Sequence, residues 1–223
     1  MKKGQLYDSI KKQIKLPLFN QIEAFIHQLD AHSISTKRKE VLLLLIDSIQ
    51  RKMDANQAIR LNFICTHNSR RSHFAQIWAQ TLANSFNLDV ACYSGGTEAT
   101  AIYPKVIETL EKTGFEVEKL SNEANPVYAI KFGEDEEPII GFSKKIDHTF
   151  NPSIGFVAIM TCSQADVDCP LVLGADQRIS VPYNDPKAFD ETELQAEEYL
   201  RTSQRIATEM KYVFSQIQKN NEF

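Results

Sequence analysis

The 223-residue chain has few cysteines, no long apolar run and little excess charge, and each shortage excludes a class of protein. Four cysteines in a chain of this length do not make a disulfide framework, so we expect them to be catalytic, metal-binding or buried in a reducing compartment. The longest strongly apolar run, residues 41–46, is too short to span a bilayer. A net charge of -4 gives no reason to expect nucleic acid or an anionic membrane as partner.

The first residues also lack the apolar core of a signal peptide. Together with the lack of a spanning segment, this predicts a cytoplasmic protein. The composition, 43% hydrophobic and 24% charged, is that of a globular chain and argues against disorder. The length is sufficient for one domain of ordinary size with an extension.

The most informative stretch lies between an apolar run that ends at Ile64 and the start of a helical pattern. It reads Cys65-Thr66-His67-Asn68-Ser69-Arg70-Arg71-Ser72. The order predicts a strand, a tight loop and a helix N-terminus, where successive backbone N–H groups can bind a tetrahedral oxyanion.

Three side chains of this loop have chemical roles in that interpretation. Cys65 is the candidate nucleophile, because the same environment favours a thiolate. Arg71 can donate two hydrogen bonds to oxygens of the anion. Ser72 can hydrogen-bond to the sulfur or cap the first turn of the helix. The alternative is a buried structural cysteine followed by a surface arginine, since a spacing like this one also occurs by chance.

The stretch resembles the phosphate-binding loop of the low-molecular-weight protein tyrosine phosphatase family, which includes the thioredoxin-coupled arsenate reductases. Arsenate reductases of that family typically read Cys-Thr-Gly-Asn-Ser-Cys-Arg-Ser. This chain has His67 in place of the glycine and Arg70 in place of the second cysteine. Histidine is one of the few residues other than glycine that tolerate a left-handed backbone, as a glycine position can require.

Residues 1–57 are predicted to be an all-helical N-terminal extension, which the resemblance does not cover. Apolar residues recur at helical spacing over residues 6–29, with an interruption at Pro17, and again over residues 41–53. These apolar stripes are expected to be buried either on the rest of the chain or in a homodimer. Residues 58–223 are then the second domain, which carries the chemistry.

The rest of the chain alternates strands and helices. A strand over residues 59–64 and one over residues 89–94, with a helix between them, form a βαβ unit, so the two strands should be parallel. A further helix is expected over residues 104–114. Residues 156–161 are an unbroken apolar run, typical of a strand buried on both faces, and residues 178–182 are the last strand. The sequence therefore predicts an α/β fold with four mostly parallel strands flanked by helices, as in the low-molecular-weight phosphatases.

A connection over residues 122–155 is longer than the family generally has. Residues 127–132 and 139–142 are expected to pair as a hairpin across an acidic turn. The segment lies where it could shape the rim of a site.

A second cysteine segment follows the buried strand, which places Cys162 at the end of the sheet where ligands bind in open α/β folds. Cys169 lies seven residues later, too far for a Cys-x-x-Cys redox motif, and no second pair is present to complete a zinc site. The segment resembles the redox segment of thioredoxin-coupled arsenate reductases, which ends in Cys-Pro. The alternative is two unrelated cysteines. Cys92, inside a strand, is interpreted as a small buried residue.

Asp185 follows the last strand and precedes a proline. In the family an Asp-Pro pair at this point carries the general acid, and Asp185 matches it, although an isolated Asp-Pro is usually only a turn. Asp190 with Glu193 resembles a capping box at the start of the closing helix.

The resemblance covers about residues 58–218 and implies reduction of arsenate to arsenite. Cys65 would attack arsenic while Asp185 protonates the departing hydroxyl, and Cys162 and then Cys169 would carry a disulfide toward thioredoxin. Neither a cofactor nor a metal is expected to be bound. One alternative is a phosphatase that hydrolyses a phosphomonoester through a phosphocysteine. Another is a non-enzymatic module that binds an oxyanion or senses redox state.

Overall fold

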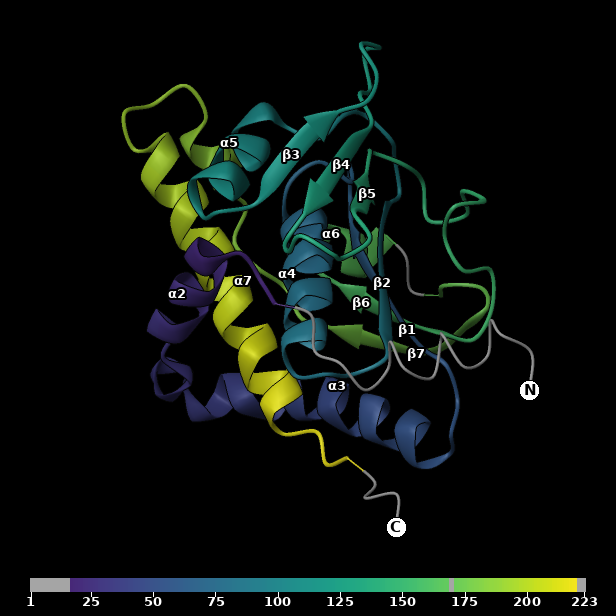
Figure 1. The fold of residues 1–223 in the computed structure, drawn as a ribbon. Coiled ribbons are helices and arrows are strands. Elements are labelled where there is room, and N and C mark those ends of the chain that lie inside the picture. Colours follow the sequence, from purple (N-terminus) through teal and green to yellow (C-terminus); the bar gives the residue numbers. More distant parts are fainter. Residues whose placement is uncertain (1–16, 169–170, 220–223) are drawn as a thin grey trace, which may run out of the picture.

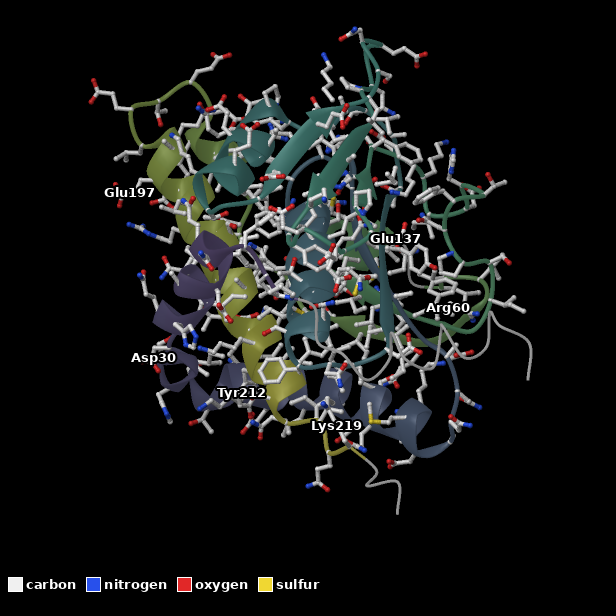
Figure 2. The ribbon with its side chains drawn as sticks, in the orientation of Figure 1. Asp30, Arg60, Glu137, Glu197, Tyr212 and Lys219 are labelled. Carbon is white, nitrogen blue, oxygen red and sulfur yellow. The ribbon has the colours of Figure 1, made fainter. Side chains whose placement is uncertain are left out.

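A central sheet with helices packed around it forms the body of the molecule, and a smaller sheet lies beside it (Figure 1). The computed structural model describes residues 17–168 and 171–219. The helical pattern predicted over residues 6–16 and the predicted redox residue Cys169 lie outside the described residues. Charged side chains such as Asp30 and Glu197 lie on the periphery of the molecule (Figure 2).

The central sheet has four strands in the order β2-β1-β6-β7 within the described residues, and all neighbouring pairs are parallel. The strands are β1 (Ile59–Cys65), β2 (Val90–Gly96), β6 (Phe156–Met160) and β7 (Ala175–Ser180). This confirms the predicted α/β class. Every residue of β6 is buried, because this strand lies in the middle of the sheet with neighbours on both sides.

The helices and the 3₁₀ turn that follow β1 are α4 (Arg71–Ser85), α5 (Pro104–Lys112), α6 (Ser163–Asp168), η2 (Pro186–Phe189) and α7 (Gln195–Ser215). Three helices predicted for this domain are confirmed by α4, α5 and α7, whereas α6 and the 3₁₀ turn η2 were not predicted. α4 crosses over from β1 to β2 and packs against both strands and against α7. None of the described helices combines the length and the apolarity that crossing a bilayer would need.

The N-terminal extension packs on the sheet domain of the same chain. It contains α2 (Asn20–Gln28), η1 (Ala31–Ser33) and α3 (Thr36–Asp54). Leu42 and Leu45 of α3 are fully buried in the same hydrophobic cluster as Leu61 of β1. The apolar stripe of α3 is therefore buried within the chain, and a homodimer through these helices remains a prediction.

Polar contacts also join the extension to α7. Arg38 of α3 forms two hydrogen bonds with the carboxylate of Glu209, at 2.9 and 2.8 Å, and Glu209 is only 2% exposed. Lys211 donates to the carbonyls of Ile26 and Leu29, both at 2.8 Å. Removing the extension would leave Glu209 and Lys211 without these partners.

The second sheet is antiparallel and has the order β3-β4-β5. Its strands are β3 (Glu116–Lys119), β4 (Tyr128–Lys131) and β5 (Ile139–Gly141). The hairpin predicted across the acidic turn is confirmed by β4 and β5. The sequence did not predict β3, because three of its four residues are charged and exposed and it has no alternating apolar face. After β5 the chain returns to the central sheet, where Lys145 bridges to Gly96 at the end of β2.

Candidate active site

Residues 66–70 form the loop between β1 and α4, at the carboxyl end of the parallel strands. Carbonyl groups of this loop accept hydrogen bonds from neighbouring segments. The Thr66 carbonyl accepts from the Glu98 amide at 2.8 Å, and the His67 carbonyl accepts from the Ser143 hydroxyl at 2.9 Å. The segments after β2 and after β5 therefore fix the back of the loop.

Glycine is required where β2 meets this loop. A Cβ atom at Gly96 would lie 2.6 Å from the Thr66 carbonyl oxygen and 2.7 Å from the Asn68 amide nitrogen. Such distances are too short for a side chain, so the close approach of the two backbones depends on glycine at this position.

The backbone amide groups of the loop have no partner among the residues that the structure describes. Within the described part of the chain, no backbone N–H of residues 66–72 has a hydrogen-bond acceptor. Several of these residues are nonetheless buried, including Asn68 and Ser72, which are both 0% exposed. Buried backbone donors are rarely left unpaired, and a run of them at a helix N-terminus is suited to an anion.

Cys65 lies at the end of β1 and is 4% exposed. Its Sγ atom lies 3.1 Å from the hydroxyl of Ser72. That hydroxyl accepts a hydrogen bond from the side-chain amide of Asn68 at 2.8 Å, so its own proton is available for the sulfur. The Ser72 hydroxyl is therefore placed to donate to the Cys65 sulfur.

The left-handed residue of the loop is Asn68, with φ of 45°, and His67 does not have a positive φ. The left-handed position of the loop is therefore the residue after the one at which the family has glycine. Asparagine tolerates this conformation because its short polar side chain can form local hydrogen bonds. Its Oδ1 atom accepts from the backbone amide of Lys144 at 2.8 Å, which ties the loop to the segment after β5.

A buried polar network that sequence reasoning missed lies behind Asn68. The ring of His73 hydrogen-bonds through Nε2 to the Asn68 carbonyl at 2.9 Å and lies 3.4 Å from the Ser94 hydroxyl through Nδ1. Burial, with a further contribution from the charge of Lys144, lowers the pKa of His73 to about 3. His73 is therefore neutral at pH 7, and Nε2 carries the proton that the carbonyl accepts.

Lys144 completes this network and is 1% exposed. Its ammonium group lies 3.3 Å from the Phe142 carbonyl, 3.4 Å from the Ser94 hydroxyl and 4.6 Å above the Phe142 ring. Burial lowers the pKa of Lys144 from 10.5 to about 8. Among the described residues no carboxylate forms an ion pair with it, and no local sequence signal distinguishes this lysine from its exposed neighbour Lys145.

Arg71 and Asp185 lie 114 residues apart in sequence and form an ion pair beside the loop. The Arg71 guanidinium also donates to the Tyr183 carbonyl at 3.0 Å. These two contacts use two of its five N–H donors, so three remain for an oxyanion. The structure thus brings together the predicted anion ligand and the predicted general acid.

The side chain of Arg70 points toward α7 and not into the loop. It donates to the Tyr199 hydroxyl at 2.6 Å and pairs with Asp190 at 2.5 Å, and its guanidinium lies 4.1 Å from the centre of the Tyr103 ring. Any contribution of Arg70 to oxyanion binding is therefore restricted to its backbone N–H. The capping-box interpretation of Asp190 was wrong, because α7 begins later, at Gln195, and Asp190 binds Arg70 instead.

The side chains of two other predicted oxyanion ligands also contact residues outside the loop. The Ser69 hydroxyl donates to the Ala101 carbonyl at 2.7 Å. The His67 ring is 45% exposed and lies 3.5 Å from the Glu98 carboxylate. Only the backbone N–H groups of Ser69 and His67 are left to bind an anion.

Cys162 lies beside the loop because β6 pairs with β1. Thr161 donates through both its amide and its hydroxyl to the Ile64 carbonyl, at 2.7 and 2.8 Å. The next residue, Cys162, is 1% exposed, and its Sγ atom lies 3.5 Å from the Thr66 hydroxyl. Cys65 and Cys162 belong to one small buried cluster, and both are free thiols.

The segment after Cys162 is anchored to β7. Ala165 donates its amide to the Cys162 sulfur at 3.3 Å. Asp166 pairs with Arg178 at 2.6 Å and accepts from the Ser180 hydroxyl at 2.8 Å. These contacts fix α6 against the sheet in the reduced protein.

Cys92 is buried in β2, as its position in an apolar strand predicts. Burial raises the pKa of this thiol far above its ordinary value, so it is a poor nucleophile. Within the described residues no group of three or more His, Cys, Asp or Glu side chains lies close enough to hold a metal ion.

Residues 60–134 match the family model described as low molecular weight phosphotyrosine protein phosphatase. The matched span contains the whole loop from Cys65 to Ser72. The matched residues are about a third of the chain, and over this span the chain is similar to the low-molecular-weight protein tyrosine phosphatase family. In this chain, the loop, Arg71 and Asp185 lie together at the carboxyl end of the central sheet.

Arsenate reductases are among the proteins whose sequences are similar to this chain. The arsenate reductase of Staphylococcus aureus (strain Newman) is 33% identical over 109 residues, which are 48% of this chain and 63% of the relative. The chain thus matches less than two thirds of that relative's length. The arsenate reductase of Staphylococcus epidermidis (strain ATCC 12228 / FDA PCI 1200) is 28% identical over 133 residues, 60% of this chain and 82% of the relative.

The solved structures that match this chain include a low molecular weight phosphotyrosine phosphatase from Vibrio cholerae O395. It is 13% identical to this chain, with a TM-score of 0.48, over 70% of this chain and 94% of that protein.

Proposed function

We propose that the protein reduces arsenate to arsenite, with Cys65 as nucleophile, and that a thioredoxin-type protein returns it to the reduced state. One observation carries the proposal. Cys162 lies at the end of β6, next to the end of β1 that carries Cys65, and the Thr66 hydroxyl contacts its sulfur. Hydrolysis of a phosphoester needs only one thiol, whereas reduction of arsenate needs a second thiol within reach of the first.

The first step is substitution at arsenic. Arsenate is a tetrahedral oxyanion, and the free amides of residues 66–72 together with Arg71 provide donors for its oxygens. The Cys65 thiolate forms a sulfur–arsenic bond while one arsenic–oxygen bond breaks. Asp185 protonates the departing hydroxyl group, which leaves as water. Arsenic remains in its pentavalent state.

The second step transfers two electrons. The Cys162 thiolate attacks the Cys65 sulfur, a disulfide forms and the sulfur–arsenic bond breaks. Its electron pair remains on arsenic, which is released as trivalent arsenite. Cys169 then attacks Cys162 and frees Cys65, and an external dithiol reduces the Cys162–Cys169 disulfide. A reducing compartment such as the cytoplasm would supply that dithiol.

A phosphatase is the second candidate, and one observation favours it. Cys65, Arg71 and Asp185 are sufficient for hydrolysis of a phosphomonoester through a phosphocysteine, and none of the three requires Cys162. Cys162 would then protect the nucleophile as a reversible disulfide. A non-enzymatic oxyanion-binding or redox-sensing module is less well supported, because binding alone needs no proton donor beside the anion ligand.

Parallel assays distinguish these functions. Purified protein is assayed with arsenate plus a thioredoxin system, and separately with p-nitrophenyl phosphate. We expect arsenate-dependent consumption of reductant and weak hydrolysis. Cys162→Ser should abolish turnover with arsenate, and the matched control Cys92→Ser should retain it. Hydrolysis that is strong and unchanged in Cys162→Ser, with no reductant consumption by the wild type, would identify a phosphatase.

A further inference from the structure

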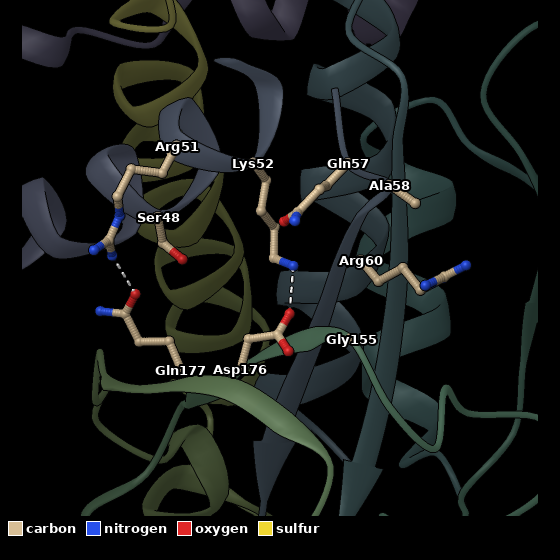
Figure 3. A pocket seen from close by; sticks show the side chains of 9 residues that line it. All are labelled: Ser48, Arg51, Lys52, Gln57, Ala58, Arg60, Gly155, Asp176 and Gln177. Atoms are coloured by element: carbon tan, nitrogen blue, oxygen red, sulfur yellow. Dashed lines mark hydrogen bonds and ion pairs between the residues drawn. The ribbon is translucent and has the colours of Figure 1, made fainter. Parts of the chain in front are cut away.

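A polar pocket lies at the end of the sheet opposite to Cys65 (Figure 3). α3 of the extension forms one wall, and the beginnings of β1 and β7 form the other. Its volume is about 640 Å³, within the range of small-molecule sites. Because Cys65 is at the opposite ends of the parallel strands, the pocket is separate from the candidate active site.

Positive charge predominates in this pocket. Arg51, Lys52 and Arg60 line it, and among the described lining residues Asp176 is the only one with a carboxylate. Lys52 forms an ion pair with Asp176, which leaves the charges of the two arginines in excess. Arg51 donates to the side chain of Gln177 at 2.7 Å, whereas the Arg60 guanidinium has no acceptor within the described residues.

Ser48 is the second observation that indicates a ligand. It is 4% exposed and lines the pocket, with its hydroxyl between the side chains of Arg51 and Lys52 in the view of Figure 3. In the part of the chain that the structure describes, this hydroxyl has no hydrogen-bond partner. Ser48 Oγ is not among the described side-chain atoms that are both inaccessible and unpaired, so the hydroxyl is open to the pocket and can pair there with water or with an oxygen of a ligand.

The lining also limits the kind of ligand. None of the described residues that line the pocket is aromatic, so none of them is suited to stacking on a ring. Guanidinium groups match the oxygens of phosphate in a two-pronged geometry. We propose that this pocket binds a small, non-aromatic anion that carries phosphate groups. Such a ligand would contact α3 and β7 together and so join the extension to the sheet domain.

Amide-resolved NMR titration with inorganic pyrophosphate tests the proposal at constant ionic strength. The titration distinguishes the two candidate anion sites of the protein. The amide signals of Gly155 and Gln177 report on the pocket, and those of Asn68 and Ser69 report on the loop. We expect saturable shifts of the Gly155 and Gln177 amides. Shifts confined to the loop amides at millimolar pyrophosphate would overturn the proposal and leave the proposed function untouched.

Charge variants of opposite sign make the test sharper. Arg60→Gln should weaken pyrophosphate binding at the pocket by about tenfold or more, because a charge-assisted hydrogen bond is lost. Asp176→Asn should strengthen it, because the opposing carboxylate is removed and Lys52 is freed. Arg201→Gln, on the exposed face of α7, is the matched control and should leave it unchanged. Equal affinity in Arg60→Gln and Arg201→Gln would refute the site even if Asp176→Asn is unstable.

Discussion

Replacement of Lys144 by methionine tests the buried network behind the loop. Methionine retains most of the aliphatic stem and removes the ammonium, which is buried without a carboxylate partner among the described residues. The backbone hydrogen bond from residue 144 to Asn68 is independent of the side chain and should persist. The variant therefore isolates the free energy of burying this charge.

The size of this free energy follows from the pKa of Lys144, which burial lowers from 10.5 to about 8. At about 1.4 kcal/mol per pH unit, the charged form costs the folded state about 3 kcal/mol. Below pH 8 the lysine is charged in both the folded and the unfolded protein, so the full cost is present. Between pH 8 and 10.5 the folded protein loses the proton first, so its stability should rise by up to about 3 kcal/mol.

Urea unfolding from pH 7 to 10.5 measures this rise. Other groups also titrate in this range, so the relevant quantity is the difference between wild type and Lys144→Met at each pH. We expect Lys144→Met to be missing the rise, whereas Lys145→Met, which replaces an exposed neighbouring lysine, should retain it. If the free energies of unfolding of wild type and Lys144→Met change with pH in parallel, Lys144 is not a buried charge of this kind.

Three further predictions concern His73, the cysteines and the extension. Because burial lowers the pKa of His73 to about 3, the unfolded state takes up a proton first as pH falls below 6.5. Stability should then fall by up to about 5 kcal/mol toward pH 3, and His73→Gln should reduce this slope in urea unfolding. Cys169→Ser should allow one turnover with arsenate and accumulate a Cys65–Cys162 disulfide, visible by mass spectrometry; its absence would contradict the relay. Deletion of residues 1–55 should cause aggregation or a change of oligomeric state in size-exclusion chromatography, because it exposes buried apolar residues. A soluble, monomeric truncated protein that has lost only activity would instead place part of the site in the extension.

The sequence by itself determined the features that depend on neighbouring residues. The apolar run, the short polar loop and the helical pattern around Cys65 predict a strand, an anion-binding loop and a helix, and the structure has β1 and α4 there. The βαβ order predicts parallel strands because a short crossover allows little else. The hairpin of β4 and β5 follows from two apolar runs on either side of an acidic turn.

The tertiary structure alone decided which distant residues meet. Arg71 meets Asp185 because the ends of β1 and β7 lie at one edge of the sheet, and nothing local to either residue specifies that pair. The same applies to Arg70, whose sequence position suggests an anion ligand but whose side chain has Tyr199 and Asp190 within reach.

The buried polar network behind the loop is the clearest case in which the sequence did not predict which residues meet. Of two adjacent lysines, Lys144 is buried and Lys145 is exposed. The burial of Lys144 depends on how the segment after β5 returns to β2. Asn68, and not the unusual His67, has the left-handed backbone, because the surrounding hydrogen bonds satisfy its side chain in that conformation. Local sequence patterns carry propensity and periodicity, whereas burial and pairing of these polar groups arise only from the packed chain.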